Sequence, residues 1–250
     1  MTSVLSAHDL GKSFGAVVAA SGLSMEVPAG QRVSLIGSNG AGKTTFVNMV
    51  TGYLKPDTGR ILLEGRDITA LAPRRISRMG VSRSFQIPQL CIELTALENM
   101  LVALAASDPG GRLSFWKPAH ADDQRIRAEE LLDRFGLAEY ADRPVTELPG
   151  GVRKLLDIAM ALTGRPRLLL LDEPTSGVSA EEKFPMMETV MGALARESVT
   201  VLFVEHDMDI VTRYADRVVA FFNGRIIADD PPDRVLDDPE VQRYVTGSAR

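Results

Sequence analysis

Short apolar segments alternate with longer amphipathic stretches through most of the chain. The clearest predicted strands are Gln31–Ile36, Leu168–Leu171, Thr200–Val204 and Val218–Phe222. A short apolar run bounded by turn residues is typical of a strand that is buried on both faces. Because helical stretches separate these strands, the pattern predicts an α/β fold built on a parallel sheet.

Two regions depart from this alternation. In the first 30 or so residues, short segments of alternating apolar and polar residues are separated by glycines, which predicts short antiparallel strands. The middle of the chain is mostly helical, with an apolar stretch at Thr95–Ala106 and an amphipathic one at Ala121–Phe135. Between them, Ser107–Pro118 is rich in Gly, Pro and Ser, so we expect a surface loop. Its Phe115 and Trp116 either anchor the loop to the body or contact a partner.

Charge and composition narrow the function. The formal net charge is −5 and the calculated isoelectric point is near 5.3, which disfavours a nucleic-acid-binding protein, usually a basic one. The single cysteine, Cys91, excludes a disulfide within the chain and favours a reducing compartment. We expect it to be buried as a small apolar residue. No secretory signal pattern opens the chain and no window approaches the ~18 apolar residues of a membrane span. A soluble protein that reaches any membrane through a partner is therefore expected.

Residues 37–44 match the phosphate-loop pattern G-x-x-x-x-G-K-[ST]. Glycines let the backbone wrap closely so that its N–H groups point at phosphate oxygens, and the following helix adds its positive N-terminus. Lys43 can reach the β- and γ-phosphates, and Thr44 can place its hydroxyl on Mg²⁺. The expected contacts to ATP are Gly37, Ser38, Asn39, Gly40, Ala41, Gly42, Lys43, Thr44 and the adjacent Thr45.

An acidic pair follows the four-leucine strand Leu168–Leu171. Asp172 leaves the end of that strand, where it can hold the magnesium shell, and Glu173 is placed to polarise an attacking water. By itself such a pair is also a common way to end a strand. In a chain that also carries a phosphate loop, it favours a nucleotide-hydrolysing site.

With these two motifs, the chain resembles the ATP-binding cassettes of the ABC transporter superfamily over essentially its full length. The resemblance implies a P-loop NTPase with a RecA-like core, an antiparallel β edge and a helical subdomain. Residues 1–250 would form a single ATPase domain, whose core combines residues 1–88 and 157–230. Residues 89–156 would form the helical subdomain, and residues 232–246 a short C-terminal helix.

The resemblance assigns further residues. Phe14 lies where the family has an aromatic residue that stacks on adenine, although a core phenylalanine is the alternative. Gln86, in the sequence Ser84–Gln86, matches the glutamine that senses the γ-phosphate and Mg²⁺. His206, at the end of a predicted strand, matches the switch histidine. Together with Glu173 these imply a catalytic set of Glu173, His206 and Gln86, and Mg²⁺ ligands Thr44, Gln86 and Asp172.

The signature segment departs from the family pattern, which reads Leu-Ser-Gly-Gly-Gln before a helix. This chain has Leu148, Pro149, Gly150, Gly151 and Val152 instead. The two glycines allow close backbone approach to a phosphate, whereas proline offers neither a hydroxyl nor an N–H. In this family the signature contacts the ATP held by the opposite cassette, so the deficit concerns the partner's nucleotide. Either that site is slow, or water replaces the lost contact.

The resemblance is strongest to cassettes of branched-chain amino acid importers, on stretches such as Glu205–Met208, Ala215–Arg217 and Asp238–Val241. It implies a second cassette, taken to be a different chain, two membrane-spanning permease subunits and, indirectly, a periplasmic substrate-binding protein. The chain would sit peripherally on the cytoplasmic face of a bacterial inner membrane, with no nucleic-acid partner. Because the substrate never touches the cassette, its sequence cannot name the cargo.

Three alternatives belong to other classes. One is a soluble cassette ATPase that acts on DNA or ribosomes, which the acidic charge and the absence of a long coiled coil disfavour. The second is a non-hydrolysing regulatory subunit, suggested by Pro149 but opposed by intact Glu173 and His206. The third is an exporter of lipid or lipopolysaccharide with the same fold.

Overall fold

A six-stranded sheet forms the centre of the protein, seen in a computed structural model that describes residues 3–107 and 118–247. In spatial order its strands are β10 (Arg225–Asp230), β9 (Arg217–Phe222), β3 (Arg32–Gly37), β8 (Thr200–Val204), β7 (Leu168–Asp172) and β6 (Val81–Ser84). Neighbouring strands pair in parallel, except that β10 is antiparallel to β9. The predicted α/β fold is therefore confirmed, and the carboxyl ends of β3, β8, β7 and β6 meet at one edge.

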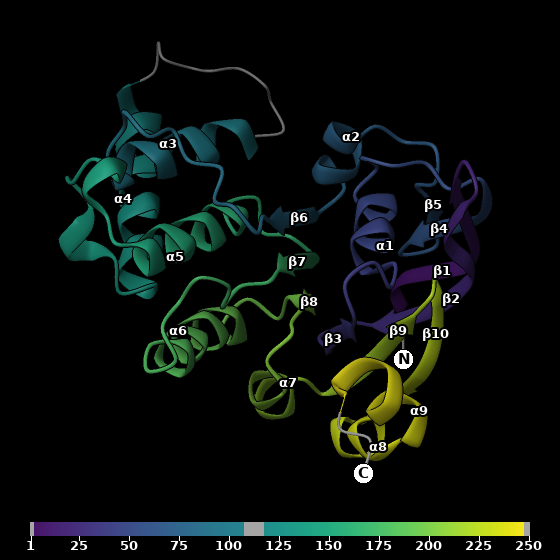
Figure 1. Ribbon diagram of the computed structural model, residues 1–250. Helices are drawn as coiled ribbons and strands as arrows, with labels where there is room; N and C mark the ends of the chain where they lie inside the picture. The colour runs from purple at the N-terminus through teal and green to yellow at the C-terminus, as the bar shows by residue number, and fades with distance from the viewer. Residues whose placement is uncertain (1–2, 108–117, 248–250) are drawn as a thin grey trace.

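A second sheet is antiparallel and is built mainly from the N-terminal part of the chain. Its spatial order is β2 (Val17–Pro28), β1 (Ser3–Phe14), β4 (Thr58–Leu63) and β5 (Arg66–Asp67). Helix α1 (Lys43–Val50) lies between this sheet and the central one (Figure 1). Apolar side chains of both sheets and of α1 form one core, with Phe46 and Phe221 in a tilted ring contact at 5.9 Å. This is the expected antiparallel β edge.

The alternation along β7 shows how the central sheet is covered on both faces. Leu168 and Leu170 belong to the core shared with α1, whereas Leu169 and Leu171 belong to the core shared with the helices on the opposite face. All four leucines are buried. A strand between two apolar layers needs apolar residues at every position, which explains the continuous leucine run.

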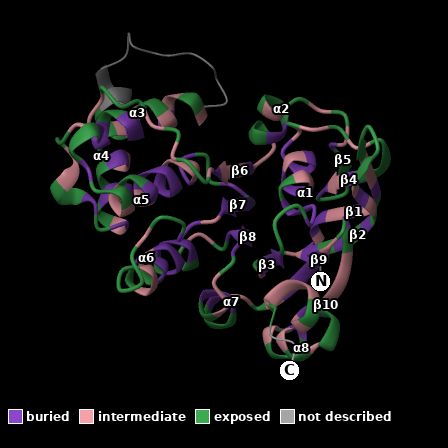
Figure 2. Cartoon of the chain, viewed as in Figure 1, coloured by how far each residue is buried: buried purple, intermediate pink, exposed green. Residues whose placement is uncertain are grey.

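The opposite layer contains α3 (Ala96–Ser107), α4 (Pro118–Arg134), α5 (Gly150–Ala161), α6 (Lys183–Ala195) and α7 (Met208–Tyr214). The first three pack against one another, and α5 also contacts β6; short 3₁₀ turns lie at Ala138–Tyr140 and Val145–Glu147 (Figure 1). Helix α3 begins at a capping box, since the Thr95 N–H donates to Glu98 and the Glu98 N–H donates to the Thr95 hydroxyl. The buried positions of α3 and α5 face inward in Figure 2.

The remaining helices are short. Helix α2 (Pro73–Arg78) precedes β6, and the C-terminal segment contains α8 (Pro232–Asp237), α9 (Pro239–Val241) and a π-helical turn, η3 (Gln242–Thr246). The single helix expected over residues 232–246 is therefore wrong. Asp238 adopts an extended backbone and accepts hydrogen bonds from the N–H groups of Glu240 and Val241, so it ends one helix and caps the next.

Three other expectations concern the division at residues 156 and 157, Cys91, and the loop that contains Phe115 and Trp116. Helix α5 starts at Gly150 and continues to Ala161, so the division expected between residues 156 and 157 falls inside a helix. Cys91 is exposed and not buried as expected, because Asn99 holds its backbone N–H and carbonyl while the thiol points outward. Phe115 and Trp116 lie outside the described residues.

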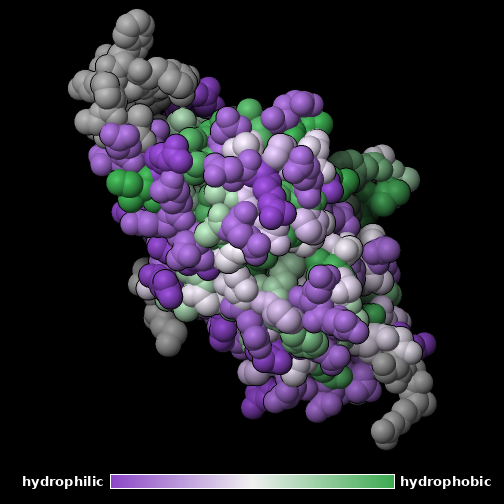
Figure 3. Space-filling view, turned by 90° about the vertical axis from the view of Figure 1, so that its left-hand side faces the viewer, coloured by the Kyte–Doolittle hydropathy of each residue, from purple (hydrophilic) through white to green (hydrophobic). Residues whose placement is uncertain are grey.

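The surface on the side of α3–α5 carries mostly polar side chains with apolar ones scattered between them (Figure 3). Within residues 3–107 and 118–247, no helix combines the length and the apolar character that crossing a membrane requires.

Candidate nucleotide-binding and hydrolysis site

The phosphate loop connects β3 to α1 at the carboxyl edge of the central sheet. Gly42 adopts φ +109°, and a Cβ there would lie 2.6 Å from the Ala19 carbonyl oxygen. Gly37 is similarly confined, since its Cβ would lie 2.5 Å from the carbonyl oxygen of Phe221. Strands β2 and β9 therefore press on the loop from outside, and only glycine fits at these two positions. The backbone of Ser38, Asn39 and Gly40 remains at an exposed surface.

Lys43 points into the loop that it follows. Its side chain is buried, and its ammonium donates to the carbonyl oxygens of Gly37 at 2.6 Å and Ser38 at 3.1 Å. Burial lowers the pKa of the ammonium, and the nearby carboxylates of Glu173 and Asp172 partly offset this. A cation held by the loop's own carbonyls is well placed to exchange them for phosphate oxygens, which are stronger acceptors.

Glu173 is held by side chains from two other segments. Its Oε2 accepts from the Gln86 amide at 2.6 Å, and its Oε1 lies 3.0 Å from Nε2 of His206. These three residues follow β6, β7 and β8, which are adjacent parallel strands. Glu173 also adopts φ +47°, a conformation that costs about 1–2 kcal/mol for a residue with a side chain. Its N–H donates to the Val204 carbonyl at 3.0 Å, which anchors the strained residue to β8.

Two comparisons of sequence establish the family. The sequence profile described as "ABC transporter" matches residues 20–176. The chain belongs to the ABC transporter family. It is 36% identical over 251 residues to the high-affinity branched-chain amino acid transport ATP-binding proteins BraF of Pseudomonas aeruginosa and LivG of Escherichia coli K12, covering 98% of each chain.

The solved structures agree. The crystal structure of the ADP conformation of MJ1267, an ATP-binding cassette of an ABC transporter, covers 97% of this chain with a TM-score of 0.86 and 34% identity. A nucleotide-free ATP-binding cassette from an ABC transporter covers 96% with a TM-score of 0.83 and 35% identity. This chain is thus an ABC ATPase, and the nucleotide is its ligand.

The ABC ATPase offers oxygen donors for a magnesium ion. Asp172 is buried at the end of β7, Thr44 is exposed in the first turn of α1, and Gln86 carries an amide oxygen. Hard oxygen donors of this kind suit Mg²⁺, which keeps several waters and takes further ligands from phosphates. The described residues contain no cluster of three or more His, Cys, Asp and Glu.

Arg83 is a residue that sequence reasoning missed. It lies on β6, and its guanidinium donates to Asp172 at 2.5 Å and to Asn48 of α1 at 2.7 Å. It also lies 4.9 Å from the centre of the Phe85 ring. The charge of Asp172 is therefore balanced from one side, which leaves its other oxygen for a metal shell. The sequence shows only that Arg83 stands three residues before Gln86, and the pairing of β6 with β7 gives it a partner.

Glu205 was matched only as part of a subfamily stretch, and the structure gives it a physical task. Its buried carboxylate accepts from the Thr175 N–H and hydroxyl at 3.0 and 2.6 Å, and from the His206 N–H at 3.0 Å. Asp207, on the other side of His206, caps α7 and pairs with Lys183, which lowers the pKa of the Asp207 carboxyl. The residues before and after His206 are thus both held by hydrogen bonds, which fixes the backbone position of the histidine.

Phe14 and the signature segment lie at or near the surface. Phe14 is 51% exposed at the end of β1, which contradicts the core alternative, and the Lys12 ammonium lies 5.8 Å from the centre of its ring. Pro149 is the N-cap of α5, so Gly150 and Gly151 form the first turn of that helix at the surface. The structure does not bring Phe14 or this segment into contact with Glu173 in the single chain.

We expect Gly42→Ala to weaken nucleotide binding by about tenfold or more, about 1.4 kcal/mol, because the new Cβ would displace the phosphate loop. A fluorescent-nucleotide titration measures this. Gly65→Ala is the control, since Gly65 also has positive φ but a Cβ there meets nothing within 4 Å. Equal affinities for the two variants would contradict this account of the loop.

Proposed function

We propose that this ABC ATPase powers a bacterial importer for branched-chain amino acids or related small polar solutes. The observation that carries the proposal is identity of 36% to BraF and LivG along 98% of the chain, with no large insertion between the ATPase motifs. Proteins with these names are described as high-affinity branched-chain amino acid transport ATP-binding proteins. Neither the exporter nor the soluble-ATPase alternative has a comparable observation behind it.

The hydrolytic chemistry follows from the contacts of Glu173. Phosphoryl transfer needs little covalent help, so positioning and charge dominate. Glu173 would hold the attacking water, and His206 and Gln86 would orient its carboxylate and contact the γ-phosphate. Thr44, Gln86 and Asp172 would hold Mg²⁺, which neutralises phosphate charge when bound. Phe14, the phosphate loop with Thr45, and the partner's signature would complete the ATP site.

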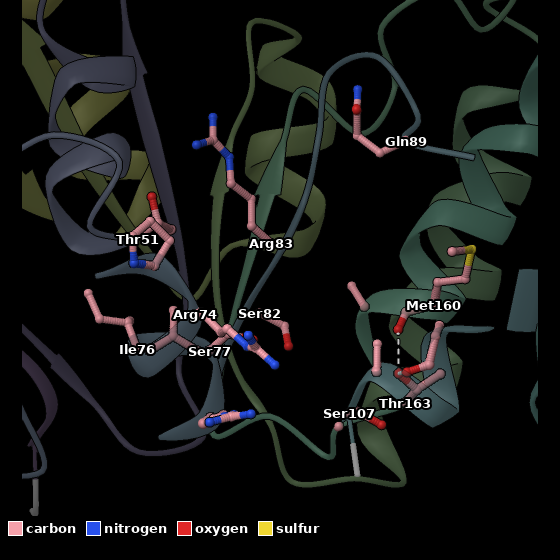
Figure 4. A pocket seen from close by; sticks show the side chains of 18 of the residues that line it. Thr51, Arg74, Ile76, Ser77, Ser82, Arg83, Gln89, Ser107, Met160 and Thr163 are labelled. Carbon is pink, nitrogen blue, oxygen red and sulfur yellow. Dashed lines mark hydrogen bonds between the residues drawn. The ribbon is translucent and has the colours of Figure 1, made fainter. Parts of the chain in front are cut away.

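The permease subunits would bind at a cavity of about 640 Å³, which lies between α2 and β6 on one side and α3 and α5 on the other. We name it the α2–α5 groove. Its walls include Thr51, Arg74, Ile76, Ser107, Met160 and Thr163. Figure 4 shows Thr51 and Ile76 on one side and Met160 and Thr163 on the other, with Arg83 between them.

Exposed apolar side chains in this groove and in the adjoining loop support the docking of a partner. Tyr53, which lines the groove, is 61% exposed; Ile87 and Ile92, in the loop whose residues Phe85 and Gln89 also line it, are 75% and 56% exposed. Exposed apolar side chains that gather at a concave site are typical of a partner surface. Because the groove borders the Gln86 loop, docking there would bring the membrane subunit next to the hydrolytic site.

We expect Glu173→Gln to leave ATP binding unchanged and to lower ATP turnover by ~10²-fold or more, because the amide cannot polarise the water. It should also accumulate an ATP-bound dimer, visible by size-exclusion chromatography. Glu181→Gln is the matched control at an exposed glutamate. Lys43→Ala should instead weaken ATP binding. Turnover by Glu173→Gln close to that of the control would refute the assignment.

The importer proposal predicts a complex with two membrane subunits encoded beside this chain. In proteoliposomes that contain this complex, with ATP inside and a leucine-loaded periplasmic binding protein outside, radiolabelled leucine should accumulate inside in an ATP-dependent manner. Glu173→Gln in the same complex should abolish uptake while the complex still forms. Outward movement of lipid, or purification without any membrane subunit, would favour one of the alternatives.

Pro149 predicts unequal sites if the partner cassette carries an intact signature. A lost hydrogen bond to a charged phosphate is worth about 1.5–3 kcal/mol, or roughly one to two decades in rate if it acts mainly in the transition state. The N–H groups of Gly150 and Gly151, in the first turn of α5, remain. Glu173→Gln in this chain should therefore remove most turnover, and the matching change in the partner little. Equal losses in single-site variants, or a working homodimer, would exclude the asymmetry.

A further inference from the structure

Two side chains of helix α5 form hydrogen bonds with the loop that carries Gln86, on both sides of that residue. The Asp157 carboxylate accepts from the N–H groups of Phe85 and Gln89, each at 3.0 Å. The Lys154 ammonium donates to the carbonyl oxygens of Phe85 at 3.1 Å and Gln86 at 2.7 Å. Four hydrogen bonds thus fix the backbone of a loop that has already left the β6 ladder at Ser84.

Both side chains are unusual for their positions. Lys154 is 2% exposed and Asp157 is 6% exposed, on a helix whose other buried residues are apolar. Burial lowers the pKa of the Lys154 ammonium and raises the pKa of the Asp157 carboxyl, and the nearness of the two opposite charges partly offsets both effects. Burying ionised groups is unfavourable unless they are paired and hydrogen-bonded. The two charged groups are therefore compensated by hydrogen bonds to loop peptide groups that have no strand partner.

The two ends of this connection carry chemistry. Gly150 and Gly151 open α5, and Lys154 lies four residues after Gly150, about 6 Å along the helix axis. At the other end, the Gln86 amide donates to Glu173 at 2.6 Å. A chain of hydrogen bonds thus runs from the signature-bearing helix to the carboxylate beside the phosphate loop.

We propose that Lys154 and Asp157 are positioning residues for hydrolysis, which fix the Gln86 loop to α5 and so hold Gln86 against Glu173. The proposal rests on the roles given above to Gln86 and Glu173. The two buried charges then couple the signature segment to the Gln86 loop. When Gly150 and Gly151 contact the partner's nucleotide and α5 is displaced, the Gln86 loop moves with it. The two ATP sites of a dimer are then linked through one helix.

The kinetic test uses Lys154→Met, which keeps the length and removes the three donors, in the assembled transporter. We expect the kcat for ATP to fall about tenfold, with the KM and the nucleotide affinity changed less than about twofold. Lys55→Met is the matched control at an exposed lysine. Asp157→Asn, which leaves one acceptor of two, should reduce kcat in the same way and keeps the test usable if Lys154→Met folds poorly.

A double-mutant cycle separates positioning from general stability. In a Gln86→Ala background, Lys154→Met should lower kcat less than about twofold further, because the lysine acts through the missing side chain. The same tenfold loss in both backgrounds would overturn the proposal. Amide hydrogen exchange offers a readout independent of activity: Asp157→Asn should speed exchange at residues 85–89 while α5 stays protected. Unchanged exchange at residues 85–89 would also overturn it.

Glu173→Gln run in parallel distinguishes two failures. If that variant keeps full turnover, the proposed hydrolytic site is wrong. If it loses turnover while Lys154→Met and Asp157→Asn retain theirs, the site stands and the positioning role of α5 is wrong.

Discussion

The carboxylate of Glu173 depends on a contact network that no single segment provides. Gln86 and His206 each reach one of its oxygens, and the Val204 carbonyl holds its backbone at φ +47°. Parallel pairing of β6, β7 and β8 places the ends of these strands side by side, so three residues far apart in the sequence meet at one sheet edge. Any shift of one strand end moves one of the groups that orient the carboxylate.

Buried charges around this edge serve geometry more than stability. Arg83 balances Asp172, Glu205 fixes the backbone at Thr175 and His206, and Lys154 and Asp157 fix the loop of Gln86. Breaking such groups leaves an unpaired buried charge, whereas replacing them by apolar residues is often tolerated in simple cores. Charged groups that each bind peptide N–H or C=O groups of functional loops are consistent with selection for position.

The local structure of the signature segment does not by itself give its role, which depends on a second cassette. Pro149 caps α5 without a side-chain hydrogen bond, and of the two glycines that follow it, Gly150 is exposed and Gly151 is half-buried. A serine there would cap the helix by about 1 kcal/mol and offer a hydroxyl to a phosphate. Under the proposed function this segment would contact a nucleotide on another cassette, and the missing hydroxyl would act there. Its consequence is therefore a property of the dimer.

The sequence by itself determined the α/β class, the phosphate loop and the strand-end positions of Asp172, Glu173 and His206, because these depend on apolar runs and short motifs. Lys154 and Asp157 could not be recognised as loop ligands, since their partners are peptide groups of a segment nearly 70 positions away. The exposure of Cys91 and the break at Asp238 were likewise decided by hydrogen bonds to specific neighbours. Tertiary structure alone decided which buried charge meets which backbone group, because hydrogen bonding depends on three-dimensional distance and leaves no periodic trace along the chain.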